Sequence, residues 1–165
     1  MAHPAQLPVK ELVADCEFRR TRRSGPGGQH RNKVETAVVV EHVPTGVRAE
    51  ANERRSQEQN RQAAIHRLRV KLAIELRCPA EATNSPLWES RTAGGKLSVN
   101  AEHDEFPAHL AEALDAIAQL DFDLAAAATK LGVSSSQLVK FLKIEPAALA
   151  SVNLARLERG LSPYR

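Results

Sequence analysis

A chain of 165 residues is long enough to bury a real core in one domain or in two small ones. Its hydrophobic content of 42% is ordinary for a globular protein, and no apolar run approaches the length of a membrane span, so no membrane association is expected. The net charge is only +3, but residues 1–77 hold fifteen Lys and Arg against nine Asp and Glu, whereas residues 78–165 hold eight against eleven. This asymmetry predicts that the front half faces a nucleic acid.

The two cysteines, Cys16 and Cys78, have no His or Cys partner at the spacing of a metal site. We therefore expect two unpaired, buried thiols in a reducing compartment and no metal site. The N-terminus lacks the apolar core of a signal peptide. Together these features predict a soluble, cytoplasmic protein.

The first elements in the chain are predicted strands. Residues 15–21 alternate between apolar and charged side chains, and residues 37–43 are apolar and β-branched. A Pro-Thr-Gly turn at 44–46 comes next, after which residues 47–51 return as the hairpin partner. The sequence therefore predicts a small antiparallel sheet.

A long helix is predicted over residues 56–76. Ser56 and Gln59 have the spacing of a capping box at its start. Apolar residues recur at helical spacing along it, namely Ala64, Leu68, Leu72 and Leu76. One sheet covered by one helix makes a small α+β domain.

Residues 77–107 lack periodicity and are predicted to be a linker or an extended arm. Trp88 is expected to anchor this arm on the core rather than to stack on a base. The residues expected to interrupt regular structure here are Pro79, Pro86, Gly94, Gly95 and Pro107.

The remainder of the chain is predicted to be helical. Residues 109–120 carry Leu and Ile at helical spacing, and Asp121 can cap the Ala-rich helix after them. Beyond a Gly-Val turn, Ser134 caps a further helix, and Pro146 begins the last one. The Ala-rich helix, the turn and the helix after Ser134 resemble a helix-turn-helix.

These elements predict an α+β protein with three parts. A small N-terminal domain, with a short β-sheet packed on one long helix, occupies residues 1–77. A linker or extended arm occupies residues 78–107, and an all-α, helix-turn-helix-like module occupies residues 108–165.

The stretch with the clearest functional signal is Ser-Gly-Pro-Gly-Gly-Gln-His at residues 24–30. Its glycines and proline exclude a regular helix or a central strand. Gly27 and Gly28 have no Cβ, so the backbone can come close to a partner. Gln29 is next, with a side chain that both donates and accepts hydrogen bonds. Residues 18–34 contain no Asp or Glu, so this loop suits a polyanionic site.

The residues themselves argue against a conventional catalytic base. Gln29 cannot take a proton at neutral pH, and no carboxylate pair or Ser-His-Asp arrangement is visible. His30 is adjacent, but neighbouring side chains often diverge and a base must reach the proton it removes. A backbone N–H directed at developing negative charge is a better use of two glycines.

The loop resembles the catalytic loop of class I peptide-chain release factors, the Gly-Gly-Gln family. The resemblance continues through His30 and Asn32, through Glu-His-Val-Pro-Thr-Gly-Val at 41–47 and through Arg-Arg-Ser-Gln at 54–57, all in family order. It covers roughly the first half of the chain. Arg31 stands where the family usually has a small apolar residue, and we expect its side chain to extend outward.

This resemblance implies hydrolysis of the ester between a nascent peptide and tRNA in the peptidyl-transferase centre of the ribosome. The implied catalytic residues are Gly27, Gly28 and Gln29. The backbone amide of Gln29 would stabilise the transition state or the leaving hydroxyl, and its side chain would favour water over larger nucleophiles. The ribosome and the tRNA would supply the remaining chemistry, so no metal or cofactor is implied. Methylation of Gln29 by a glutamine methyltransferase is a further expectation.

Basic residues that flank the loop are expected to contact ribosomal RNA phosphates, which positions the loop without reading sequence. They are Arg19, Arg20, Arg22, Arg23, Arg31 and Lys33, with Arg54, Arg55 and Gln57 as additional candidates.

Full-length termination factors carry further domains that read the stop codon, and the chain has no room for these before its loop. It therefore resembles the short, codon-independent ribosome-rescue hydrolases. We expect a monomer that acts on P-site peptidyl-tRNA in a stalled ribosome or large subunit. Short members often end in a basic tail, whereas the last cations here lie in predicted helices. The helical module is therefore expected to dock on ribosomal RNA, tRNA or a stalled large subunit.

Two other functions stay open at this stage. A non-catalytic ribosome- or RNA-binding module would bind ribosomes without releasing peptide. A helix-turn-helix DNA-binding protein would use residues 134–143 as its recognition helix. That helix has only Lys140 and Lys143 as cations and no Arg, which is little for phosphate contact or base reading.

Overall fold

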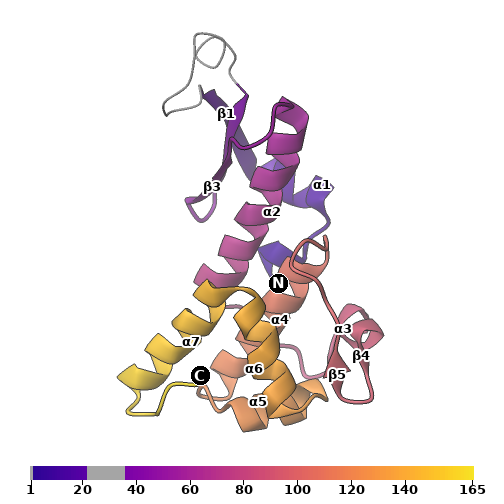
Figure 1. Ribbon diagram of the computed structural model, residues 1–165, viewed down its shortest axis with the longest axis vertical. Helices are drawn as coiled ribbons and strands as arrows, with labels where there is room; N and C mark the ends of the chain where they lie inside the picture. Colours follow the sequence, from indigo (N-terminus) through magenta and orange to yellow (C-terminus); the bar gives the residue numbers. More distant parts are fainter. Residues whose placement is uncertain (1, 22–35) are drawn as a thin grey trace. The chain divides into compact units, whose positions relative to one another are not determined.

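The computed structural model describes residues 2–21 and 36–165, which fall into two compact units (Figure 1). The sheet unit consists of the described residues within 7–72. The helical unit consists of the described residues within 1–6 and 73–165. The fold class is α+β, as the sequence predicts.

Three antiparallel strands form the sheet unit's sheet, in the order β1-β2-β3. Their bounds are Cys16–Thr21 for β1, Ala37–His42 for β2 and Val47–Ala51 for β3. These are the predicted strands, and Gly46 supplies a left-handed residue, with φ 72°, in the turn between β2 and β3. A short helix α1 (Val9–Leu12) and a 3-10 turn η2 (Val13–Asp15) precede β1.

One face of this sheet is apolar because the pairing brings apolar side chains opposite one another. Phe18 stands opposite Val40, and Val40 stands opposite Ala49. The other face carries charged side chains, including Glu41 opposite Arg48, which form an ion pair of 2.7 Å. Alternation along the strands therefore leaves one side to be covered by a helix.

Helix α2 (Gln57–Glu75) covers the apolar face (Figure 1). Ser56 caps its start, since the Ser56 Oγ accepts a hydrogen bond of 3.4 Å from the Gln59 amide, as predicted. The guanidinium of Arg61 lies 4.4 Å from the centre of the Phe18 ring. The apolar side chains of α2 that are fully buried include Ala64, Leu68 and Leu72.

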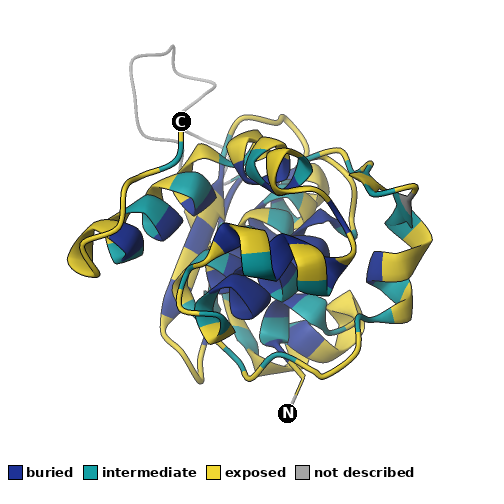
Figure 2. Cartoon of the chain, turned by 90° about the horizontal axis from the view of Figure 1, so that it is seen from below, coloured by how far each residue is buried: buried dark blue, intermediate teal, exposed yellow. Residues whose placement is uncertain are grey.

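The helical unit is built mainly of helices, with a 3-10 turn and a two-stranded hairpin. Its first elements are η1 (Pro4–Gln6), α3 (Pro86–Arg91), β4 (Thr92–Ala93) and β5 (Lys96–Leu97). The later helices are α4 (Phe106–Gln119), α5 (Leu124–Leu131), α6 (Ser135–Ile144) and α7 (Pro146–Glu158). Buried residues gather on the inner sides of these helices (Figure 2).

Trp88 lies at the centre of the helical unit. Its side chain is fully buried, and its Nε1–H donates a hydrogen bond of 2.8 Å to the Leu131 carbonyl. Its ring meets that of Phe141 edge to face, with centroids 6.1 Å apart. The prediction that Trp88 anchors its segment on the core is confirmed.

The segment predicted to be a linker contains regular structure of its own. Pro86 opens α3, whose cap is Ser85, and Pro107 lies in the first turn of α4. The expectation that prolines interrupt regular structure in this segment is therefore wrong for these two positions. Proline is tolerated in the first turn of a helix, because the N–H that it lacks would have no partner there.

The cap of α5 is also different from the one predicted. Asp121 and Phe122 have positive φ angles of 51° and 62°, so the chain turns before the helix begins. The cap is Asp123, whose Oδ1 accepts hydrogen bonds from the amides of Ala125 and Ala126. The turn from α5 to α6 is as predicted, with Gly132 left-handed and Ser134 as the cap of α6.

Both cysteines are free thiols that are partly exposed, whereas the sequence predicts burial. Within the part of the chain that the structure describes, no helix is both long enough and apolar enough to span a membrane.

Candidate functional site

The predicted catalytic residues Gly27, Gly28 and Gln29 lie outside the described residues. The same holds for four of the predicted RNA-contacting residues, Arg22, Arg23, Arg31 and Lys33. The structure does describe Arg19, Arg20, Arg54, Arg55 and Gln57, together with the framework on both sides of the motif.

The two ends of that framework lie side by side. Thr21, the last residue of β1, pairs with Ala37, the first residue of β2. Thr36 is therefore close to the point at which the described chain stops after β1. The chain leaves and re-enters the sheet at one place, between neighbouring strands.

Asn60, on the first turns of α2, holds this place together. Its Nδ2 donates hydrogen bonds to the carbonyls of Thr36, at 2.7 Å, and Arg54, at 3.0 Å. Its Oδ1 accepts a hydrogen bond of 2.9 Å from the amide of Arg54. The side chain is fully buried, so these backbone groups have little access to water and depend on it. Asn60 thus fixes the strand entry at Thr36 and the backbone of Arg54 relative to each other.

A second polar contact fixes the connection between β3 and α2. The guanidinium of Arg67 makes two hydrogen bonds to the Glu53 carboxylate, of 2.7 and 3.2 Å, and a third of 2.8 Å to the carbonyl of Glu50. Slight burial raises the pKa of Glu53, but the backbone amides of Asn52 and Glu53 and the Arg67 guanidinium outweigh it, so the pKa lies below its usual value. Arg54 and Arg55 come directly after this fixed point.

The predicted RNA-contacting residues that the structure describes are all exposed except Gln57, which is half-buried at the start of α2. Arg19 and Arg20 are neighbours on β1 and therefore point to opposite faces of the sheet. Arg19 lies 3.8 Å from Glu17, with both side chains more than 60% exposed. Asn60 bonds to both Thr36 and Arg54, so the backbone of Arg54 lies near the start of β2. The side chain of Arg19 lies on the face of the sheet that α2 does not cover.

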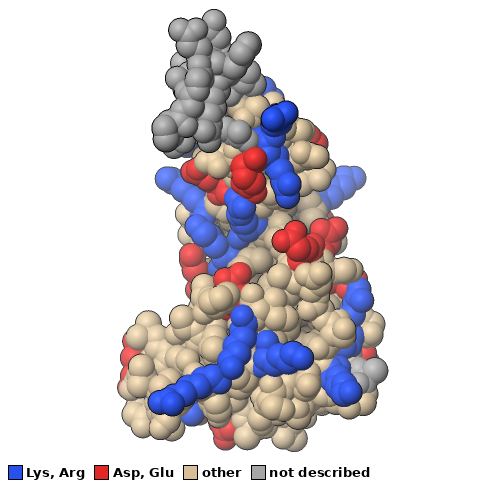
Figure 3. Space-filling view, viewed as in Figure 1, with Lys and Arg blue, Asp and Glu red and all other residues tan. Residues whose placement is uncertain are grey.

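On the face that Figure 3 shows, acidic and basic side chains are intermixed over the described sheet unit. Several of its cations are engaged within the protein. Arg48 pairs with Glu41, Arg67 pairs with Glu53, and the Lys71 ammonium donates to the Arg48 carbonyl at 2.8 Å. Overall charge therefore overstates the number of cations available to a nucleic acid.

Sequence reasoning missed Asn60, Glu53 and Arg67 as positioning residues. The signal for Asn60 was its position: Asn is a poor helix former, yet it stands inside the first turns of a strongly predicted helix. The pairing of Glu53 with Arg67 joins residues that are distant in sequence, and no local pattern indicates it.

Comparison with known proteins gives a consistent result for this region. A family model described as the RF-1 domain matches residues 8–104, which is more than half of the chain. The match includes the whole described sheet unit from residue 8 onward and ends just before α4. The chain therefore belongs to the RF-1 domain family, that of the class I peptide chain release factors.

Among curated proteins, the chain is similar to peptide chain release factor 1 of Acidiphilium cryptum (strain JF-5), with 38% identity over 109 residues. It is also similar to peptide chain release factor 1 of Delftia acidovorans, with 37% identity over 94 residues, and of Chlorobaculum tepidum, with 38% over 113 residues. These alignments cover 62%, 57% and 64% of this chain. They cover only 31%, 26% and 31% of the respective relatives, so the chain matches about a third of their length or less.

Proposed function

We propose that this protein is a codon-independent peptidyl-tRNA hydrolase that frees nascent peptides from stalled ribosomes or large subunits. Residues 1–77 would carry the catalytic domain, and residues 108–165 would form a module that docks on the stalled particle. The observation that carries the proposal is the Gly-Gly-Gln motif at residues 27–29 in a chain that belongs to the release-factor family. The codon-independent character rests on the sequence resemblance to short ribosome-rescue hydrolases.

In the proposed reaction, water attacks the carbonyl carbon of the ester that joins the peptide to the terminal ribose of tRNA. A tetrahedral intermediate with a negatively charged oxygen forms, and the bond to the ribose oxygen then breaks. The ribose oxygen takes up a proton, which leaves a peptide with a free carboxylate and a deacylated tRNA. The protein has to supply a place for water and a hydrogen-bond donor for the developing charge.

The backbone N–H of Gln29 would be that donor. Gly27 and Gly28 would let the chain approach the ester, because no Cβ stands in the way. The Gln29 side chain would admit water and exclude larger nucleophiles. No side chain needs to act as a base if the ribosome and the tRNA ribose handle the proton.

The described framework supports this role for the motif. A donor stabilises a transition state only if it is already in place when charge develops. The paired ends at Thr21 and Ala37 and the clamp made by Asn60 would anchor both ends of the segment that carries the motif. Arg20, Arg54 and Arg55, which are exposed, would hold RNA phosphates nearby.

The partners are those that this reaction requires. The protein would act as a monomer in the cytoplasm on the peptidyl-transferase centre and P-site peptidyl-tRNA. A glutamine methyltransferase would modify the Gln29 side-chain nitrogen. Mass spectrometry of the protein purified from its source would detect the added methyl group.

The test is peptide release from purified ribosomal complexes that carry labelled peptidyl-tRNA. The A site would hold a stop codon, a sense codon or no codon, and split large subunits would form a fourth substrate. We expect the rate of peptide release to be similar for complexes with a stop codon, with a sense codon and without a codon in the A site. Release only at stop codons would overturn the codon-independent part. Ribosome binding without release from any substrate would favour a non-catalytic RNA-binding module instead.

A further inference from the structure

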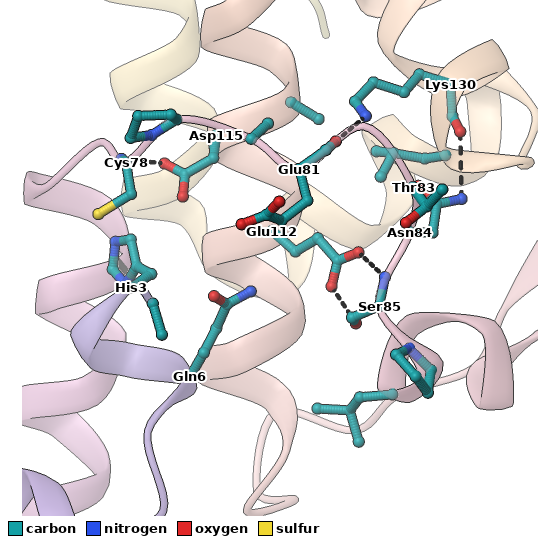
Figure 4. A pocket seen from close by; sticks show the side chains of 17 residues that line it. His3, Gln6, Cys78, Glu81, Thr83, Asn84, Ser85, Glu112, Asp115 and Lys130 are labelled. Carbon is teal, nitrogen blue, oxygen red and sulfur yellow. Dashed lines mark hydrogen bonds between the residues drawn. The ribbon is translucent and has the colours of Figure 1, made fainter.

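Three potential metal ligands from distant parts of the sequence meet in the helical unit. His3 lies just before η1, Cys78 comes after α2, and Asp115 is on α4. One ligand atom of each, a ring nitrogen, the sulfur and a carboxylate oxygen, lies within 4.8 Å of the other two. Figure 4 shows the three side chains close together at one end of a cavity of about 440 Å³. This cluster is independent of the proposed function.

His3 supplies the strongest indication that this cluster binds a ligand. The residue is 1% exposed, and its buried Nε2 makes no hydrogen bond of standard geometry, although the Leu76 backbone lies close to the ring. Its Nδ1 accepts a hydrogen bond of 3.0 Å from the Ala5 amide, which holds the ring in place. Buried polar atoms without a partner are uncommon in native proteins and call for an explanation such as an ion. Among the described side chains that line the cavity, only His3 has such an atom.

Asp115 and Cys78 are also held in place. Asp115 is only 5% exposed, and its Oδ1 accepts a hydrogen bond of 3.0 Å from the Cys78 backbone amide. This contact orients the carboxylate and fixes the backbone that carries the thiol. In the described part of the chain, no hydrogen bond joins the three side chains to one another. The three side chains therefore lie close together without using one another as hydrogen-bond partners.

The other polar side chains of the cavity include two charged groups that already have partners. The Glu112 carboxylate accepts hydrogen bonds from the Ser85 amide, at 2.8 Å, and from the Ser85 hydroxyl, at 2.5 Å. The Lys130 ammonium donates to the carbonyl of Glu81 at 2.6 Å. These two charged groups are therefore satisfied within the protein.

We propose that His3, Cys78 and Asp115 bind a zinc ion, with a water molecule from the cavity in the fourth position. Nitrogen, sulfur and carboxylate oxygen together are donors that zinc accepts, whereas magnesium and calcium require oxygen. In a tetrahedral zinc site the donor atoms stand roughly 3.3–3.6 Å apart. The separations of up to 4.8 Å here would have to shorten by about 1 Å when the ion binds.

The charges agree with a divalent cation. A thiolate and a carboxylate balance its two charges, and histidine binds as the neutral ring. Binding at Nε2 would move the ring proton to Nδ1 and give up the hydrogen bond from Ala5, a small loss beside the affinity of zinc sites.

Arg77 is the nearby positive charge that opposes a cation. Its guanidinium is directed at the end of α2, where it donates to the carbonyls of Ala73 and Ile74, each at 2.7 Å, and to that of Leu76. Its charge is thus shared with the negative end of the helix dipole. A zinc ion would join residues 2–6, the segment after α2 and helix α4 as a structural cross-link.

The test uses the full chain without a histidine tag, after chelator treatment and dialysis, and titrates it with Co²⁺ as a spectroscopic substitute for zinc. We expect one Co²⁺ per chain, a thiolate-to-cobalt charge-transfer band in the near ultraviolet, and loss of the band when Zn²⁺ is added. Cys78→Ser should abolish the band. Cys16→Ser, the matched control at the other free thiol, should leave it unchanged.

Further variants separate metal binding from folding. Asp115→Asn keeps an acceptor for the Cys78 amide, and His3→Gln changes a residue near the end of the described chain, so both should fold, as circular dichroism would show. Each should weaken zinc binding at least about 100-fold, since losses outside the ligand set already cost about 10–100-fold. The control His103→Gln, at a side chain 43% exposed, should bind as the wild type does.

Thermal unfolding supplies a second readout. Saturating Zn²⁺ should raise the Tm of the wild type by several degrees, because it binds the folded state, and a chelator should reverse the shift. A wild type without a thiolate band at one equivalent of Co²⁺ would overturn the proposal. So would a band that persists in Cys78→Ser, or equal zinc affinity in His3→Gln.

Discussion

The sheet unit and the helical unit use polar residues in different ways. In the sheet unit, Asn60 bonds to the backbone of Thr36 and Arg54, and Arg67 bonds to the backbone of Glu50, so both side chains fix connections between elements. In the helical unit, Trp88 and Phe141 form an aromatic core, and the conspicuous polar cluster is turned inward. The polar residues of the first unit thus fix its connections, whereas those of the second lie in its interior.

The family match extends over parts of both units. It covers residues 8–104 and stops before α4, so helices α4 to α7 are not part of it. The match therefore includes the described sheet unit from residue 8 onward together with α3, β4 and β5 of the helical unit. Substitutions in each unit can break or refine the contrast, and the largest expected effect is in the helical core.

Trp88→Ala should give the largest loss of stability. It removes a fully buried ring and leaves the Leu131 carbonyl without its donor, which we expect to cost about 3–5 kcal/mol. Trp88→Phe keeps most of the packing and should cost less. Hydrogen exchange should rise most in α4 to α6 and least in β2 and β3. Equal loss of protection in both units would contradict the division of the chain into two units.

Asn60→Ala should be the most damaging single change in the sheet unit. Backbone groups of Thr36 and Arg54 lose their partner, at an expected cost of about 2–3 kcal/mol in urea unfolding. At a temperature where the variant is folded, we expect peptide release to fall at least tenfold while ribosome affinity changes little. Gln62→Ala, on the same helix but exposed, is the matched control. Release that falls only in proportion to the folded fraction would leave Asn60 without a positioning role.

Changing Arg54 and Arg55 together to Gln should weaken ribosome binding by about tenfold at physiological salt. It should also reduce the slope of log affinity against log salt by about 1.4–1.8, as loss of two phosphate contacts would. Arg48→Gln is the control, because Arg48 is already paired with Glu41. An unchanged slope in the double variant would mean that neither residue touches phosphate.

The smallest effect concerns pH. Burial lowers the pKa of His42, which is 4% exposed and lies 2.8 Å from the Thr45 hydroxyl. The folded state therefore resists protonation of this ring more than the unfolded state does. The stability it contributes is present above the unfolded pKa of about 6.5 and is lost as pH falls below it. Between pH 7.5 and 5, wild type should lose more unfolding free energy than His42→Gln, and parallel curves would contradict this.

Much of the fold could be predicted because its signals are local. Strand alternation, the Gly46 turn and the caps Ser56 and Ser134 each depend on a few neighbouring residues, and all agree with the structure. The prolines Pro86 and Pro107 were harder to interpret. A proline can interrupt a helix or stand in its first turn, and which of the two occurs depends on the residues after it. Asp121 and Asp123 are equivalent as caps by residue type, and only the left-handed turn at Asp121 distinguishes them.

For the candidate site, the sequence indicates only the motif, which stays a prediction because it lies outside the described residues. The Gly-Gly-Gln stretch at 27–29 is contiguous, so its composition alone indicates an exposed loop in a basic region. The side chains that frame it are not contiguous. Asn60 reaches Thr36 across 24 residues. In the separate cluster of the helical unit, His3 meets Cys78 only through the tertiary fold. Spacing rules for metal ligands cannot find a pair separated in this way.

The central claim is that the main-chain N–H of residue 29 assists water in cutting peptidyl-tRNA, and two substitutions at Gln29 test it most directly. Gln29→Ala keeps this N–H, whereas Gln29→Pro removes it. With ribosome binding intact in both, we predict that Gln29→Pro loses peptide release by about 10²–10³-fold, the effect of removing one donor to developing negative charge, and that Gln29→Ala loses far less. Near wild-type release by Gln29→Pro would contradict the account.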